Sequence, residues 1–293
     1  MRNILILEGP FCPVRKVEMQ WPVEQLSPFT TYPAPSESKS LFTEFLLKPV
    51  QLRSGKYICG LGASLTPAHP ADWAEWTDEL LGNDRWLDSL GRLSQLQPEP
   101  FRVWIMLPYP VYWMYIDTKE RIDAVKVWIE EFTSRFASSP AATSLQLSGF
   151  IWGRESVHEN DIPVVQGIND VIHSMQLRSL WLPNYSGARV QEWSGLGFDE
   201  AALFSNYTGS GPITKDWVRN ACKSALVHQF GLQMVYGIGK RFRAGHIETY
   251  KEWITHYIRS GGAGPIIHRC FYLKPQEMMS VLPIMGNILR FMK

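Results

Sequence analysis

Carboxylate, amide and aromatic side chains come directly after short apolar runs that are typical of β-strands. Sugars present hydroxyl groups that hydrogen-bond to carboxylates and amides, and C–H faces that stack on aromatic rings. This combination therefore predicts a carbohydrate ligand, although large aromatic side chains at strand ends can also simply close a core. The residues concerned are Glu8, Tyr109, Tyr112, Trp113, Trp152, Arg154, Glu155, His158, Asn184, Tyr185, Asn206, Tyr207, Tyr236 and Tyr272.

The spacing of the other reactive side chains argues against several alternative chemistries. The seven histidines form no HxH or HExxH motif, and the four cysteines are far apart without a CxxC pair, so no metal site is expected. The segment Gly209-Ser210-Gly211 is not a GxSxG nucleophile elbow. No GxGxxG motif follows the first strand, and Gly60-x-Gly62 alone is weak support for a dinucleotide site. We therefore expect no metal and no cofactor.

The elements that must position these side chains alternate between strand and helix. Strands are predicted at Asn3–Leu7, Leu41–Leu47, Lys56–Leu61, Arg102–Leu107, Leu145–Trp152, Ser179–Leu182, Glu200–Phe204, Leu232–Tyr236 and Pro265–Tyr272. Helices are predicted at Ala71–Gln95, Thr118–Phe136, Pro163–Met175, 188–195, 215–229, 247–259 and from Pro275 onward.

This alternation predicts right-handed crossovers and a parallel sheet. About eight units in 293 residues favour a single (β/α)8 TIM barrel over residues 1–293, with a doubly wound open sheet as the alternative. An extended N-terminal loop after strand 1, rich in Pro, Ser and Thr, is expected over residues 9–40. In a parallel barrel the active site lies at the carboxyl ends of the strands, which is where the sugar-binding candidates fall. Asp199 precedes its strand and should lie at the opposite face.

Composition excludes further classes of protein. The chain is 45% hydrophobic and 19% charged with net charge +1 and no large basic cluster, so neither nucleic acid nor an anionic membrane is an expected partner. No apolar run reaches membrane-spanning length, which predicts a soluble protein. The apolar run after Met1-Arg2-Asn3 is too short for a signal peptide, so we expect a cytoplasmic protein as the sequence stands, or a secreted one whose leader was removed.

Several motifs, in order and spacing, resemble the family called domain of unknown function 4855. The resemblance is carried by Gly149-Phe150-Ile151-Trp152-Gly153-Arg154-Glu155-Ser156, Leu180-Trp181-Leu182-Pro183-Asn184-Tyr185, Leu196-Gly197-Phe198-Asp199 and Ser205-Asn206-Tyr207, and more weakly by Ala71-Asp72-Trp73 and Leu107-Pro108-Tyr109-Pro110. It covers about residues 40 to 275. The family is regarded as having TIM-barrel, glycoside-hydrolase-like character, so the resemblance implies that fold and a carbohydrate substrate.

Carried over by position, the resemblance makes Glu155 the matching acid at the end of the fourth strand, and hence the proton donor. This chain departs from the family pattern at Arg154, where another acid is frequent, and at Gln233 and Val235, where glutamates are expected in the seventh strand. Glycoside hydrolysis ordinarily needs two carboxylates. The second is Glu8, or Glu159 or Asp161, or there is none.

Glu8 is favoured because an acid after four aliphatic residues has no packing reason to be there, although a salt bridge to a loop cation such as Arg15 would also explain it. The leading interpretation is a glycoside hydrolase with Glu155 and Glu8 as catalytic residues. Sugar rings would stack on Trp152, Trp181, Tyr185 and Tyr207, and hydroxyl groups would bind Asn184 and Asn206. The alternatives are a barrel that binds a glycan without cleaving it, and an enzyme for another polyhydroxylated or amide substrate.

Overall fold

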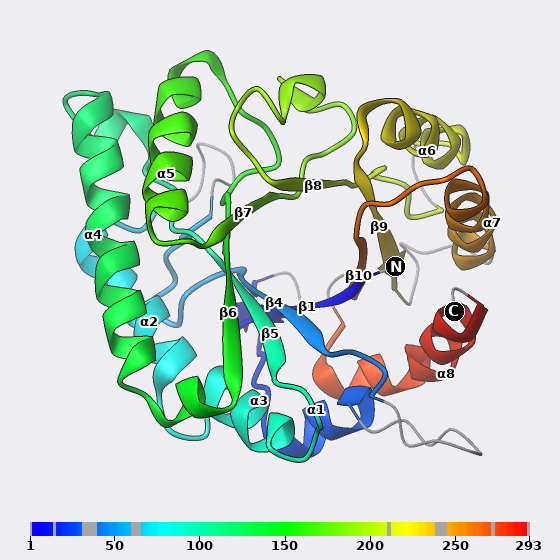
Figure 1. Cartoon of the computed structure of the whole chain (residues 1–293), viewed down its shortest axis with the longest axis horizontal. Helices are drawn as coiled ribbons and strands as arrows, with labels where there is room; N and C mark the ends of the chain where they lie inside the picture. The colour runs from blue at the N-terminus through cyan, green and yellow to red at the C-terminus, as the bar shows by residue number, and fades with distance from the viewer. Residues whose placement is uncertain are drawn as a thin grey trace.

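Eight parallel strands close into a barrel in the computed structural model, which describes residues 2–13, 16–30, 40–59, 66–209, 212–237, 245–270 and 273–291 (Figure 1). The order around the barrel is β1-β10-β9-β8-β7-β6-β5-β4, and β1 closes it by pairing with β4 as well as β10. The strands are β1 (Asn3–Gly9), β4 (Glu44–Pro49), β5 (Phe101–Met106), β6 (Leu145–Ile151), β7 (Arg178–Trp181), β8 (Glu200–Leu203), β9 (Gly231–Tyr236) and β10 (Ile266–Cys270). The predicted (β/α)8 barrel is therefore confirmed.

Helices form a ring outside the strands (Figure 1). They are α2 (Trp73–Leu81), α3 (Trp86–Ser94), α4 (Thr118–Ala137), α5 (Ile162–Ser174), α6 (Asp216–His228), α7 (His246–Arg259) and α8 (Pro275–Phe291). The helix α4 begins where its sequence predicts, because the Asp117 side chain accepts a hydrogen bond from the Glu120 backbone N–H. Its apolar face, including Val125, Ile129 and Phe132, is fully buried against the barrel.

The described residues between positions 9 and 40 contain regular elements where an extended loop was predicted. They contain the short antiparallel pair β2 (Phe11–Cys12) and β3 (Val17–Glu18) and the helix α1 (Val23–Thr30), while residues 14–15 and 31–39 lie outside the described part of the chain. The helix forms because Leu26 and Phe29 bury their side chains completely in the outer core. The expected loop is thus corrected to a hairpin and a packed helix.

Three other predicted elements differ. Residues 56–59 form no strand, because β4 pairs directly with β5 and leaves no position between them; residues 60–61 lie outside the described ranges. The predicted helix 188–195 is a single 3-10 turn, Val190–Glu192. The predicted helix over residues 71–95 is divided into α2 and α3 around Gly82.

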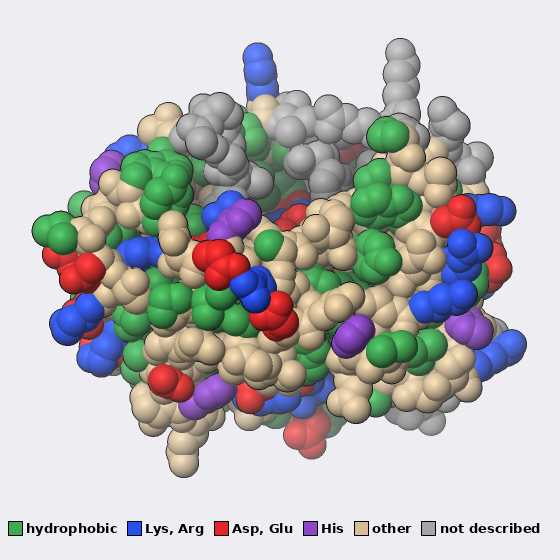
Figure 2. All heavy atoms as spheres, turned by 90° about the horizontal axis from the view of Figure 1, so that it is seen from above, with side chains coloured by type: hydrophobic (Ala, Val, Ile, Leu, Met, Phe, Trp, Pro, Cys, Tyr) green, Lys and Arg blue, Asp and Glu red, His purple; other side chains and the backbone are tan. Residues whose placement is uncertain are grey.

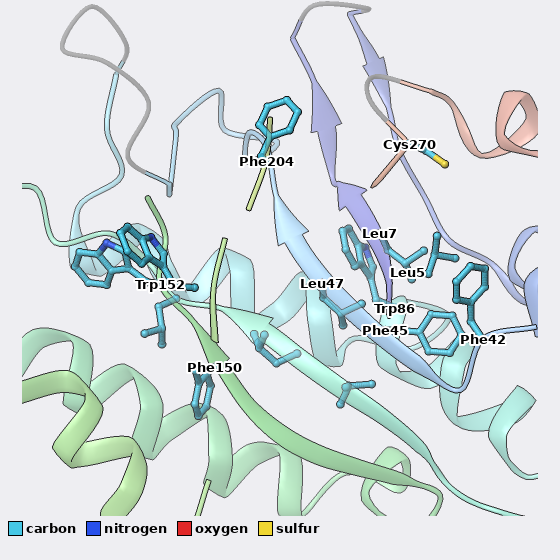
Figure 3. Packing of buried hydrophobic residues seen from close by; sticks show 14 of the residues in the cluster. Leu5, Leu7, Phe42, Phe45, Leu47, Trp86, Phe150, Trp152, Phe204 and Cys270 are labelled. Atoms are coloured by element: carbon cyan, nitrogen blue, oxygen red, sulfur yellow. The ribbon is translucent and has the colours of Figure 1, made fainter. Parts of the chain in front are cut away.

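The alternation of side chains along each strand divides the core into two layers. Inside the barrel, Ile4, Ile6, Leu46, Trp104 and Ile267 belong to one buried cluster. A larger cluster lies between the strands and the helices; Leu5 and Leu7 of β1, Phe45 and Leu47 of β4, and Phe150 of β6 belong to it (Figure 3). Along each strand, residues two positions apart therefore share a direction: those that alternate with the inner cluster face the barrel axis, and those between them face the helices.

The amino ends of the strands are closed by an ion-pair network. Arg2 pairs with Glu44 and Glu200, and Arg102 pairs with Glu44 at 3.3 Å. Asp199 also lies at this face, where it accepts a hydrogen bond from the Ser179 backbone N–H at 2.7 Å, as its position before the strand predicts. The carboxyl ends of the strands are consequently the end at which a binding site is to be sought.

The face of the molecule drawn in Figure 2 shows no separation of charge. Figure 2 shows acidic and basic side chains intermingled over the visible face. In the described part of the chain, no helix combines the length and apolar character needed to cross a membrane.

Candidate functional site

A cavity of about 390 Å³ lies at the carboxyl ends of the strands. Its size falls in the range of sites for small ligands. Met106, Leu182 and Phe204 form apolar walls. Its charged lining comprises Glu8, Lys48, Arg154, Glu155 and Arg269. A parallel barrel places its functional residues at this end because the strand–helix loops converge there.

The floor of the cavity is a buried cluster of Glu8 with two cations. Glu8 and Lys48 are paired in the β1–β4 register, so their side chains lie side by side inside the barrel. Lys48 Nζ contacts Glu8 Oε1 at 3.1 Å, and Arg269 Nε contacts the same oxygen at 3.2 Å. Each belongs to the inner set of side chains: Glu8 follows Ile6, Lys48 follows Leu46 and Arg269 follows Ile267 at intervals of two residues.

The electrostatics of this cluster keep Glu8 ionised. Burial by itself would raise the pKa of the Glu8 carboxyl, but the charges of Lys48 and Arg269 and their hydrogen bonds outweigh it and lower the pKa below its ordinary value. The alternative interpretation for Glu8 was a salt bridge to a loop cation; Glu8 does form salt bridges, but with Lys48 and Arg269 of the neighbouring strands. Arg15, the loop cation considered from the sequence, lies outside the described residues.

Glu155 enters the cavity from the loop after β6. Arg269 Nη1 donates a hydrogen bond to Glu155 Oε1 at 3.3 Å, so one guanidinium bridges the two glutamates. Because the guanidinium is small and planar, these contacts place the nearest oxygens of Glu8 and Glu155 at most about 9 Å apart. The loop backbone is held by neighbouring strand ends: Asn184 N–H donates to the Glu155 carbonyl at 3.0 Å, and Trp181 Nε1 donates to the Arg154 carbonyl at 2.8 Å.

The other two candidates for a second carboxylate do not line this cavity. Asp161 is buried behind the loop, where it accepts hydrogen bonds from Arg121 Nη2 at 2.6 Å and from the Tyr109 hydroxyl at 3.0 Å. Glu159 is exposed and paired with Arg189. Glu8 is therefore the candidate that shares the cavity with Glu155.

Arg154 connects the cavity wall to the Asp161 cluster. Its Nη1 donates to the Tyr109 hydroxyl at 2.8 Å and lies 3.6 Å from Asp161, and its guanidinium lies over the Tyr109 ring. Burial and the Asp161 charge raise the pKa of Tyr109, so its hydroxyl stays protonated. His158 stands on the exposed side of Arg154, with its Nε2 3.1 Å from Arg154 Nη2. Tyr109 and His158 thus support the wall of the cavity and are not part of its described lining.

The structure brings some predicted sugar-binding residues to the cavity. Trp152 and Asn206 line it, and Trp152 packs edge-on against Tyr109 with ring centroids 5.5 Å apart. Asn206 exchanges two amide hydrogen bonds with Asn184, at 2.7 and 2.5 Å, which fixes both side chains at the rim of the strands. The signal that identified them was their position immediately after a strand.

Other predicted residues lie elsewhere. Trp181 is fully buried in the outer layer, stacked on Phe198, and Tyr236 is fully buried with its hydroxyl 2.8 Å from His268 Nδ1. As placed, neither ring can stack on a sugar, and this corrects the expectation for both. The reason is the two-residue alternation of strands: Leu180 and Leu182 face the barrel interior, so Trp181 between them faces the helices.

The remaining described aromatic candidates are not among the residues that line the cavity. Trp113 is half exposed in a 3-10 turn and packs against Tyr112. Tyr185 packs against Trp217, and Tyr207 packs against Tyr250. Tyr272 lies outside the described residues.

Sequence reasoning missed Lys48 and Arg269, the two cations that hold Glu8. A signal was present, since each is a charged residue inside an otherwise apolar strand and in step with inward-facing aliphatic residues. Cys59 also lines the cavity; its burial raises the pKa of the thiol to about 11, which keeps it protonated.

Comparison with known proteins adds a family and a shared fold. The structure of the GH18 chitinase ChiB of Flavobacterium johnsoniae is similar over 100% of this chain and 94% of its own, with a TM-score of 0.52 and 8% sequence identity. A fungal endo-β-N-acetylglucosaminidase of glycosyl hydrolase family 18 is similar over 99% of this chain and 97% of its own, with a TM-score of 0.49 and 11% identity. No curated protein sequence matches the chain.

The similarity to the chitinase shows that this barrel has a fold also used by a glycoside hydrolase. A family model matches residues 5–272, which is most of the barrel from β1 to the end of β10. The chain therefore belongs to the family described as Domain of unknown function (DUF4855).

Proposed function

We propose that the protein hydrolyses glycosidic bonds, with Glu155 as the proton donor and Glu8 as the ionised carboxylate. One observation carries the proposal: Glu8 from β1 and Glu155 from the loop after β6 line the same cavity and contact the same guanidinium. The two come from strands that β4 and β5 separate in the barrel, so they approach a ligand from different sides. Two carboxylates on either side of a scissile bond are the arrangement that glycoside hydrolysis requires.

The environments of the two glutamates suit different roles. Glu8 is buried between Lys48 and Arg269 and stays ionised, so it would stabilise positive charge that develops on the anomeric carbon or form a bond to it. Glu155 is partly exposed, so it can reach the oxygen of an entering glycoside and transfer its proton as the carbon–oxygen bond breaks. A water molecule then adds its oxygen to the anomeric carbon and gives a proton to Glu155; if Glu8 has formed a bond to that carbon, this bond breaks in the same step and Glu8 returns to a carboxylate.

A second function, glycan binding without cleavage, is favoured by a separate observation. Two cations at 3.1 and 3.2 Å already neutralise Glu8, which reduces its ability to attack carbon. In addition, Gln233 and Val235 occupy β9 positions where the family resemblance implies acids. A binding barrel would retain the cavity and lose turnover.

Turnover of a panel of aryl glycosides and natural oligosaccharides by the wild type, Glu155→Gln and Glu159→Gln tests the proposal. Glu159 is the matched control, because it lies on the same loop but pairs with Arg189 on the surface. Loss of the acid catalyst should lower kcat by about 100-fold or more in Glu155→Gln and leave Glu159→Gln close to wild type. Full activity in Glu155→Gln would contradict the assigned role, and glycan binding without any turnover would support the second function.

A further inference from the structure

The floor of the cavity carries more positive than negative charge. Among the described residues the acid of this floor is Glu8, with 5% of its side chain exposed, and it faces Lys48 and Arg269, whose side chains are 14% and 8% exposed. Burying an ion costs free energy unless a counter-charge compensates it. The charges of these three side chains sum to +1.

Glu155 provides the compensating charge, but in a form that a ligand can replace. Its side chain is 44% exposed, it lies on a loop, and it reaches Arg269 through one oxygen at 3.3 Å. The contacts of Glu8 with the same cations are shorter and buried. Arg154 adds a further positive charge to the cavity wall, so it does not offset the positive charge of the floor.

We propose that the cavity binds a sugar bearing a carboxylate, a uronic acid residue of a glycan, and that this carboxylate takes the place of Glu155 on Arg269. The inference rests on the proposed function, in that the ligand is a glycan bound in this cavity. A carboxylate suits the position because a carboxylate, that of Glu155, occupies it in the ligand-free protein. One negative charge balances the one excess cation, whereas a phosphate monoester would bring about −1.5 to −2.

The walls of the cavity support the same ligand. The guanidinium of Arg269 lies over the Phe204 ring, 5.2 Å from its centroid, which orients the planar group that would receive the carboxylate. The apolar side chains Met106 and Leu182 lie beside it and can contact the C–H face of a sugar.

The displacement links substrate binding to proton donation. When the sugar carboxylate takes over Arg269, the Glu155 side chain is freed from that contact and can turn toward the glycosidic oxygen. A neutral sugar would leave Glu155 paired with Arg269.

Binding of methyl glycosides measured by calorimetry tests this proposal. Methyl glucuronide, galacturonide and mannuronide are each compared with the neutral methyl glucoside, galactoside or mannoside, in the wild type and in Glu155→Gln. We expect at least one uronide to bind about tenfold or more tightly than its neutral counterpart, since a charge-assisted hydrogen bond to a buried cation has that worth. Glu155→Gln should bind that uronide more tightly still, because the competing carboxylate is gone, so the ratio of its affinities for the uronide and the neutral sugar should rise above that of the wild type.

Two lysine variants test whether the preference for a uronide depends on the charge of the cavity floor. Lys48→Met removes the excess floor charge and should reduce the preference for the uronide at least several-fold, whereas Lys56→Met, which removes a lysine paired with Asp72 outside the cavity, should not. Thermal unfolding of each variant confirms that the comparison concerns folded protein.

The outcomes separate this inference from the proposed function. Equal affinity for every uronide and its neutral counterpart overturns the inference, even if neutral glycosides are hydrolysed. Tighter binding of a sugar sulfate than of any uronide overturns the assignment of a carboxylate. Uronide preference that is strengthened in Glu155→Gln supports the inference, even if the wild type cleaves no glycoside and the proposed hydrolysis fails.

Discussion

Replacing Glu8 by Gln tests whether the floor cluster holds the barrel together as its geometry implies. At an effective dielectric constant near 20, each unit-charge pair about 4 Å apart is worth about 4 kcal/mol, and Glu8 makes two such pairs with buried partners. The cost of burying the carboxylate offsets part of this attraction. Glu8→Gln also removes the buried carboxylate that Lys48 and Arg269 share, so we expect a loss of about 3–5 kcal/mol in the free energy of unfolding at pH 7.

The lowered pKa of Glu8 also predicts how the loss of stability in Glu8→Gln changes with pH. The folded-state pKa of Glu8 is lowered: burial raises it, but Lys48 and Arg269 lower it further. Its stabilisation is therefore complete above the unfolded-state pKa of about 4.3 and is lost as the pH falls through the lower folded-state value. The difference between the wild type and Glu8→Gln should thus be large at pH 7 and shrink on acidification below pH 4.

Urea unfolding monitored by tryptophan fluorescence measures both effects. Glu8→Gln combined with Lys48→Met serves as the control, since it removes one of the two opposed cations and should recover part of the lost stability. A loss below about 1 kcal/mol at pH 7, or a loss that persists unchanged at low pH, would refute the reasoning.

Three further predictions concern the layers around the barrel. Gly149→Ala should lower the free energy of unfolding by about 3 kcal/mol or more, because a Cβ there would lie 1.8 Å from the Arg178 carbonyl oxygen; an unchanged urea midpoint would contradict this. Burial lowers the pKa of His268 to about 3, so protonation favours the unfolded chain, and stability should fall as the pH drops from about 6.5 toward 3. In His268→Gln that part of the pH dependence should disappear, and an identical pH profile in the variant would count against it. Trp181→Leu should cost about 2–4 kcal/mol in urea unfolding through lost packing on Phe198, and a cost below 1 kcal/mol would show that the ring is not a core element.

The sequence predicted the barrel well because the signal is local and repeated. Short apolar runs separated by helical stretches indicate parallel strands wherever they fall, and a chain with about eight such units closes a barrel. It also placed Glu8 and Glu155 at the face where they lie. It failed over residues 9–40, where a high content of Pro, Ser and Thr concealed the packed side chains of Leu26 and Phe29.

Side-chain direction at the strand ends was harder to predict. Trp181 and Tyr236 were grouped with Trp152 because all three occur at the ends of apolar runs, and all three belong to the outer cluster, yet of these three the cavity lining includes Trp152 alone. A position at a strand end selects a face of the barrel, but whether the side chain borders the cavity depends on how the neighbouring loops pack around it.

The chain by itself thus determined which residue types stand at the carboxyl ends of the strands, because that placement follows from the order of apolar and polar residues along one segment. Only the tertiary structure decided which charges meet. Closure brings β1 between β4 and β10, which are far apart in the sequence, and so places Lys48 and Arg269 on either side of Glu8. The charge balance of the cavity, and with it the kind of ligand the cavity can accept, depends on those long-range neighbours, since ion pairing is set by distance in space.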